Sequence, residues 1–112
     1  MDSLLNYSDI LKKTVQEATR DQPGVQQIRL YPVCDLDSGH FLILGTGLDK
    51  QGWKDFILFH ARVVDRQVII EMDNFEEGLT SLLIDAGIRK EDIITGFNYH
   101  RNMTMSRDRS GI

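Results

Sequence analysis

The chain has few of the residues that build covalent or metal-bound frameworks. Its 112 residues include one cysteine, two prolines and three histidines. Because Cys34 has no second cysteine to pair with, an intramolecular disulfide and a cysteine-based zinc site are both excluded. The sequence therefore indicates a fold held together by its hydrophobic core, in a reducing environment.

Long apolar runs and targeting signals are also missing. The first residues, "MDSLLNYSDILKK", lack the basic start and apolar core that are typical of a signal peptide. No apolar run approaches the roughly 20 residues that a transmembrane helix needs. We expect a protein that acts in the cytoplasm and not in a membrane.

Positive charge is scarce over most of the chain. Thirteen lysines and arginines stand against seventeen acidic residues, for a net charge of −4. Residues 98–112 reverse this balance, since three arginines and one aspartate give them +2 and leave −6 for the rest. A surface of that sign repels the phosphate backbone, so we do not expect direct binding to nucleic acid except through this tail.

The hydrophobic pattern predicts one α+β domain over residues 1–97. Apolar residues spaced by three and four predict an N-terminal helix over residues 3–20. Shorter apolar or alternating runs predict strands, separated by turn residues. These are an edge strand over 26–35, a strand over 40–48 buried on both faces, an antiparallel hairpin over 53–72 and a short closing strand over 93–97. A further helix is predicted over 75–86, packed with the first on one face of a sheet of four to five antiparallel strands. Residues 98–112 are expected to form a weakly ordered tail.

Alternation in the third strand predicts which of its side chains share a face. Ile57, Phe59 and Ala61 fall on one face, and Phe56 and His60 fall on the other. We therefore expect the first set in the core.

Acidic residues gather where the strand pattern changes to a helical one. Asp73 and Glu76 have the spacing with which the first turn of a helix is capped by two carboxylates. An alternative is a small metal-dependent enzyme in which His60, Glu71 and Asp73 converge, although no histidine pair has the spacing of a zinc motif. The cap is the preferred interpretation, and no catalytic residue, metal site or cofactor is predicted.

Large aromatic residues near a turn are candidates for a protein contact. Trp53, the only tryptophan, precedes Phe56 and His60 on the same predicted strand. Aromatic side chains of this kind often anchor protein interfaces. We predict partner binding through these three residues.

Several motifs together resemble a known family. They are "LNYSDIL", "DLDSGHFLIL", "GW", a histidine on the third strand, "DNFEEGL" and "AGIRKEDIITGF". In this order and spacing they are similar to the XisI-like proteins, also called fdxN element excision controlling factors of cyanobacteria. The residues that carry the resemblance are His40, Gly52, Trp53, His60, Asp73, Glu76, Gly78 and Phe97.

The resemblance implies a regulatory protein without catalytic activity. Members of that family act with a partner, XisH, and influence a site-specific recombinase, XisF, during heterocyst differentiation. An XisH-like protein is therefore the expected partner, and an antitoxin-like inhibitor of a nuclease-like partner remains an alternative. Open sheet edges also favour pairing with a second copy as a homodimer.

Overall fold

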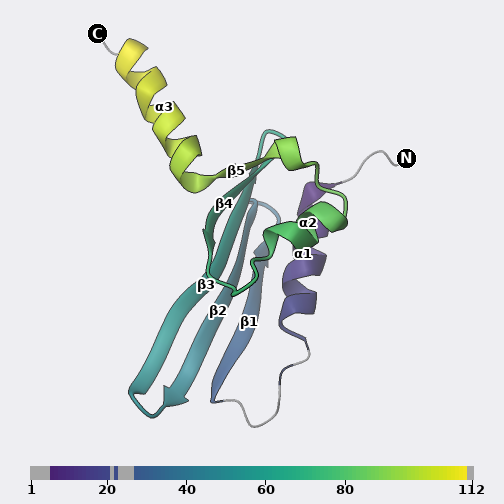
Figure 1. Ribbon diagram of the computed structural model, residues 1–112, viewed down its shortest axis with the longest axis vertical. Helices are drawn as coiled ribbons and strands as arrows, with labels where there is room; N and C mark the ends of the chain where they lie inside the picture. Colours follow the sequence, from purple (N-terminus) through teal and green to yellow (C-terminus); the bar gives the residue numbers. More distant parts are fainter. Residues whose placement is uncertain (1–5, 21, 23–26, 111–112) are drawn as a thin grey trace.

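The computed structural model describes residues 6–20, 22 and 27–110, and of residues 105–110 it describes the backbone only. Two helices cover one face of a five-stranded sheet, and a third helix projects from the sheet (Figure 1). This confirms the predicted α+β fold. The elements are α1 (Tyr7–Ala18), β1 (Ile28–Asp35), β2 (His40–Asp49), β3 (Gly52–Val64), β4 (Gln67–Asp73), α2 (Thr80–Asp85), the 3-10 turn η1 (Lys90–Asp92), β5 (Ile93–Thr95) and α3 (Gly96–Ser110).

The strands lie in the sheet in chain order, β1-β2-β3-β4-β5. The first four are antiparallel, whereas β5 is parallel to β4, a detail that the predicted all-antiparallel sheet missed. Asp65 and Arg66, between β3 and β4, both have positive φ, at 49° and 67°. Two such residues form the kind of turn whose twist matches a hairpin, so the predicted β3–β4 hairpin forms without a glycine.

The core lies between the sheet and the helices α1 and α2. Leu11 and Val15 of α1 and Leu83 of α2 are completely buried there. Burying one such side chain is worth roughly 1.5–3 kcal/mol. From the strands and the segments that flank α2 the core receives Phe41, Ile43, Phe59, Ala61, Val68, Ile70, Leu79 and Ile88.

The start of α1 follows from local chemistry. The Asn6 side chain accepts a hydrogen bond from the Ser8 amide at 2.9 Å and so caps the helix. The predicted helix over 3–20 is confirmed over Tyr7–Ala18. Its first predicted residues, 3–5, lie outside the described part.

Two β-bulges change which face the side chains occupy. Ile43 pairs with Phe59 but Leu44 pairs with Ile57, so Leu58 is an extra residue on β3. A bulge of this kind shifts the alternation by one. The prediction that Ile57 shares the face of Phe59 is therefore wrong. Ile57 lies with Leu44 on the opposite face and is exposed.

Phe56 is shifted by the same bulge. It pairs with Gly45, whereas His60 pairs with Leu42. Since Gly45 and Leu42 lie on opposite faces of β2, Phe56 and His60 are on opposite faces too. The prediction that they share a face is wrong.

The predicted burial of β2 on both faces is also wrong. Its side chains alternate between buried positions, such as Phe41 and Ile43, and half-buried positions, such as Leu42 and Leu44. Only the first set belongs to the core that α1 and α2 share with the sheet. Among the described helices, none is both long and apolar enough to cross a membrane.

The second helix is shorter than predicted, and a third helix is present that the sequence did not predict. α2 begins at Thr80 and not at Phe75, because residues 74–79 form a loop before the helix. The sequence predicted no helix in the tail, 98–112, whereas residues 96–110 form the helix α3.

Candidate interaction site

The face of the sheet opposite α1 and α2 carries apolar side chains that no helix covers. Strand register places Tyr31, Leu44 and Ile57 side by side across β1, β2 and β3. The neighbouring row runs through Val33, Leu42, His60 and Met72. Tyr31, Val33, Ile57 and Met72 are exposed. We call the side chains of these two rows, His60 included, the open face.

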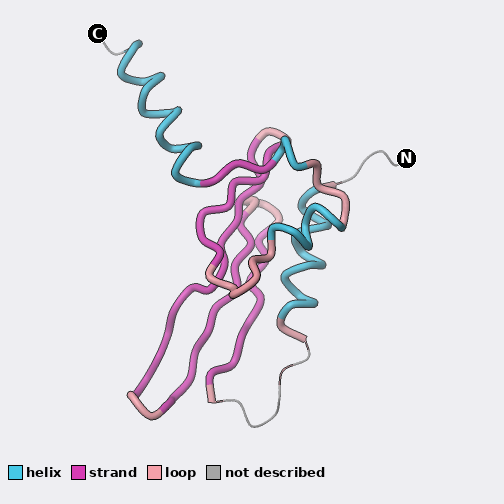
Figure 2. The backbone as a smooth tube through the Cα atoms, viewed as in Figure 1, coloured by secondary structure: helices cyan, strands magenta, loops and turns pink. Residues whose placement is uncertain are grey.

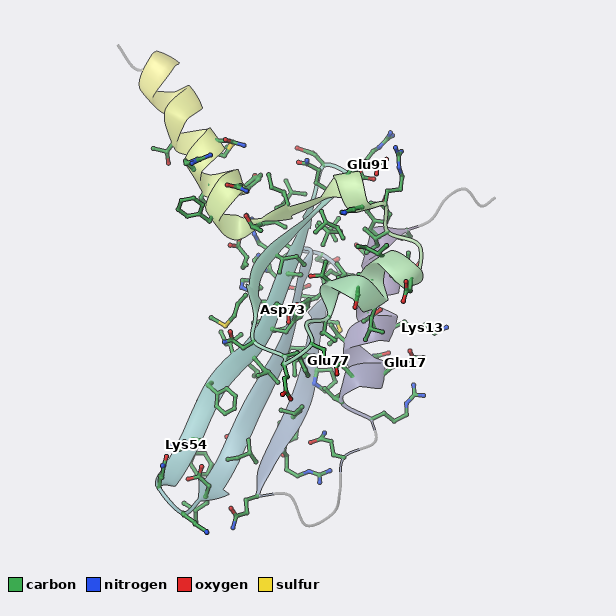
Figure 3. The ribbon with its side chains drawn as sticks, in the orientation of Figure 1. Lys13, Glu17, Lys54, Asp73, Glu77 and Glu91 are labelled. Carbon is green, nitrogen blue, oxygen red and sulfur yellow. The ribbon has the colours of Figure 1, made fainter. Side chains whose placement is uncertain are left out.

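Beyond the open face, exposed apolar side chains continue along the hairpin formed by β2 and β3. Leu48 and Trp53 pair with each other near its tip, where both are exposed. Lys54, which follows Trp53, marks this end of the molecule in Figure 3. The apolar surface therefore extends from the middle of the sheet to a tip that lies beyond α1.

The three residues predicted to bind a partner do not form one patch. Trp53 and His60 lie on the side of the open face, at its two ends. Phe56 lies on the other face, where its ring is packed so closely that a Cβ on Gly45 would come within 2.5 Å of it. Only Trp53 and His60 are available to one partner on this side.

His40 and His60 form a hydrogen-bonded pair at the inner end of the open face. His40 Nδ1 and His60 Nε2 are 3.0 Å apart, and the ring planes are inclined by 25°. One of the two nitrogens donates and the other accepts, so the bond requires at least one neutral ring. Burial, and then the nearby His40, lower the pKa of His60 below its ordinary value.

Beside this pair, an ion-pair network attaches α3 to the sheet. Glu71 accepts a hydrogen bond from Arg62 Nε at 2.8 Å and is 3.1 Å from His100 Nε2. The Arg62 guanidinium lies over the ring of Tyr99, 5.4 Å from its centroid. Burial alone would raise the pKa of Glu71, but the bonds from His100 and Arg62 outweigh it and lower that pKa.

A bulge and a glycine make this attachment possible. Glu71 is the extra residue between Ile70, which pairs with Ala61, and Met72, which pairs with His60. The bulge directs Glu71 to the same side as Arg62. Gly96 begins α3 directly over it, since a Cβ there would lie 2.3 Å from a Glu71 carboxylate oxygen. The negative charge therefore lies near the positive end of the α3 dipole.

Asp73 lies on the opposite side of β4 and has a structural role. Its carboxylate accepts hydrogen bonds from the Leu79 amide at 2.8 Å and the Phe75 amide at 3.3 Å. It therefore ties the loop and the start of α2 to the end of β4, where Figure 3 shows Asp73 and Glu77. The predicted capping pair is wrong in its geometry, because the helix starts later and Glu76 is an exposed loop residue.

The proposed metal ligands do not converge. His60 and Glu71 lie on one side of the sheet, whereas Asp73 pairs with Phe59 on the other. Within residues 6–20, 22 and 27–110, no group of three or more histidine, cysteine or acidic side chains could hold a metal ion. These positions do not support the alternative of a metal-dependent enzyme.

The other residues that carried the family resemblance lie in different parts of the fold. Gly52 begins β3 after the hairpin turn. Gly78 has a φ of 76°, a backbone conformation that favours glycine, beside the Asp73 carboxylate. Phe97 is exposed in the first turn of α3. These residues therefore shape turns and a surface, and do not gather at one site.

Sequence reasoning missed most of the open face and the network around Glu71. A signal for the face was present, because outward strand positions such as Tyr31 and Val33 are apolar where solvent-facing positions are usually polar. The network had no such signal. It depends on a bulge and on a helix that the polar composition of the tail did not indicate.

Comparisons with known proteins agree on one family. The family model described as "XisI protein" matches residues 1–107. A crystal structure of a XisI-like protein from Anabaena variabilis ATCC 29413 is similar at 18% identity and a TM-score of 0.72, over 80% of this chain and 83% of that one. The crystal structure of the fdxN element excision controlling factor XisI from the same organism is similar at 20% identity and a TM-score of 0.57, over 82% and 93% of the two chains. No curated protein matches the chain.

Proposed function

Because the chain belongs to the XisI family, we propose that it is a regulatory protein without catalytic activity that binds an XisH-like protein through the open face. In this proposal the complex controls the excision of a DNA element by a site-specific recombinase in the cytoplasm. The observation that carries it is the apolar surface on the side of the sheet away from α1 and α2. Exposed, contiguous apolar patches are uncommon on monomeric proteins and usually mark sites of protein interaction.

The shape of the open face suits a protein partner. Its central side chains, among them Leu44 and Ile57, project from rigid paired strands, so little conformational entropy is lost when a partner covers them. Tyr31 and Met72, at the two sides of the face, add an aromatic ring and an adaptable thioether. An apolar surface flanked by histidines has the composition of an interface core and its rim.

The charge of the chain supports a role through another protein. Outside residues 98–112 the chain carries −6, which opposes contact with a phosphate backbone. The partner would then contact the DNA and carry out any cleavage. An antitoxin-like restraint on a nuclease would use the same contact, and only its effect on cleavage would differ.

Copurification tests the proposal. A tagged full-length chain is produced together with the XisH-like protein encoded beside it, and with Tyr31→Asp and Met72→Asp variants. A charge buried in an apolar interface is left without a partner, so we expect each variant to lose most of the complex. Leu82→Asp is the matched control, because Leu82 is equally apolar and exposed but lies on α2 on the other side.

DNA cleavage by the partner, with and without the chain, then identifies the kind of regulation. Suppressed cleavage would indicate an inhibitor, and redirected or enhanced cleavage an excision factor. If no complex forms, or if the two variants bind as well as the wild type, the open face is not the partner site. Stoichiometric binding of Zn²⁺ or Mn²⁺ in a titration would instead support a metal-dependent enzyme.

A further inference from the structure

The chain is more extended than its length requires. Its radius of gyration is 16.1 Å and its extents are 54 × 41 × 26 Å. A compact domain of this length has a radius of gyration of about 13 Å. The excess comes from two projections, α3 at one end of the long axis and the tip of the β2–β3 hairpin at the other (Figure 1).

α3 is attached to the sheet at its base. Tyr99 and His100, in its first turns, make the contacts with Arg62 and Glu71. The rest of the helix leads away from the sheet in Figure 2. An isolated helix of about 15 residues is only marginally stable in water, and the sequence of α3 contains no alanine or leucine. A packing surface beyond the base would stabilise it.

The two projections carry the most exposed large apolar side chains of the described residues. Phe97 on α3 is 72% exposed, and Trp53 and Leu48 near the hairpin tip are 70% and 62% exposed. Met103, further along α3, is also exposed. Each projection therefore has apolar surface to bury, and their positions at opposite ends prevent them from covering each other within one chain.

We propose that two copies of this chain form a two-fold symmetric dimer in which α3 of each copy packs along the β2–β3 hairpin of the other. In Figure 1, α3 and the hairpin both lean away from α1, on the same side of the molecule. A two-fold axis between them brings each helix against the other copy's hairpin. Both halves of the contact are present in every chain, so the arrangement closes as a dimer and does not extend into a fibre.

Charge favours this pairing over a contact between two α3 helices. Residues 98–112 carry +2 and the rest of the chain carries −6. Two α3 helices side by side would repel each other, whereas the hairpin tip, residues 48–57, carries two lysines and two aspartates and does not repel α3. Arg101 already lies over the ring of Phe97, at 5.5 Å, and so forms a mixed cationic and aromatic surface to which an exposed tryptophan is suited.

The dimer goes beyond the proposed function and uses different residues. It buries Phe97, Leu48 and Trp53, and it leaves Tyr31 and Met72 for an XisH-like protein. A failure of one proposal therefore does not imply a failure of the other. Trp53, predicted from the sequence to contact a partner, would have a second copy of the chain as that partner.

Size-exclusion chromatography with light scattering measures the molecular mass of the purified full-length chain and so tests the dimer. We expect a mass twice the 12.9 kDa of one chain. Phe97→Ser and Trp53→Ser should each raise the dimer dissociation constant at least about tenfold, as expected for central aromatic contacts. Leu82→Ser, on α2, should leave it unchanged. Circular dichroism confirms that each variant is folded.

Mixing the Phe97→Ser and Trp53→Ser variants distinguishes this arrangement from other dimers. In a mixed pair, the intact α3 of the Trp53→Ser copy meets the intact hairpin of the Phe97→Ser copy, so one of the two contacts is restored. We expect the mixture to form heterodimers that neither variant forms with itself. A monomeric wild type, a dimer that tolerates both substitutions, or a mixture that stays monomeric would overturn the proposal.

Discussion

The two faces of the sheet are built from the same strands but differ in burial. Ile43 on β2 is completely buried under the helices, whereas Ile57 on β3, the same type of residue, is 38% exposed on the open face. Both faces are apolar in the middle strands. The difference shows that stability depends on the face that α1 and α2 cover, which leaves the open face available for binding.

The largest expected difference in stability is between two substitutions of isoleucine by alanine, one on each face. Ile43→Ala should lower the free energy of unfolding by about 2–5 kcal/mol, because it leaves a cavity in a packed core. Ile57→Ala should cost less than about 1 kcal/mol, since solvent fills the space that it leaves. Urea denaturation of both variants measures the two values. Similar losses for the two would mean that the open face is covered in solution.

The carboxylates of Asp73 and Glu76 offer a second comparison, between a side chain tied to the covered face and one in the loop beside it. Asp73→Ala removes the acceptor of two backbone amides and should cost about 1–3 kcal/mol. Glu76→Ala should change the stability by less than about 0.5 kcal/mol, as exposed substitutions usually do. Thermal unfolding monitored by circular dichroism is a sufficient measurement. A larger loss of stability in Glu76→Ala than in Asp73→Ala would support the capping pair that the sequence predicted.

The histidine pair should have the smallest effect on stability. Its pH dependence reports directly on the open face. Because the pKa of His60 is lowered in the folded state, unfolded chains bind its proton at a higher pH. Stability is therefore greatest above the ordinary histidine pKa of about 6.5 and falls as the pH drops below it. His40→Asn removes one of the two leading causes, so the pKa of His60 should rise but stay below its ordinary value, since its burial persists.

A titration of the His60 ring protons by NMR measures this change. Around His60, Glu71 acts to raise its pKa and Arg62 to lower it, so both residues are kept unchanged in the experiment. An unaltered His60 pKa in the His40→Asn variant would show that the two rings do not interact in solution.

Local patterns predicted the parts of the fold that depend on neighbours in the chain. The spacing of Leu11 and Val15 predicted α1, and the turn residues after Val64 predicted the β3–β4 hairpin. On β3, the faces of Phe59 and Ala61 were predicted correctly, whereas Ile57, before the bulge at Leu58, was assigned to the wrong face. An extra residue such as Leu58 leaves no mark in a sequence, because its cause is the pairing with another strand.

The open face was harder to predict than the fold for the same reason. Trp53 was predicted to contact a partner because large aromatic residues near a turn often anchor interfaces, whereas Tyr31, Leu44 and Met72 come onto one surface only when β1 to β4 are aligned. The order of α3 also depends on tertiary contacts, since Glu71 and Arg62 hold a segment whose own composition favours disorder.

The parallel pairing of β5 with β4 has a consequence for the order of folding. The first four strands connect by short turns, so their contacts are local and can form early. β5 can join only after residues 74–92 have closed a long loop around α2, which is a slower step. Because α3 begins at the end of β5, its placement waits for this closure. A newly made chain would therefore complete its core before it positions the helix that we assign to contact with a second copy.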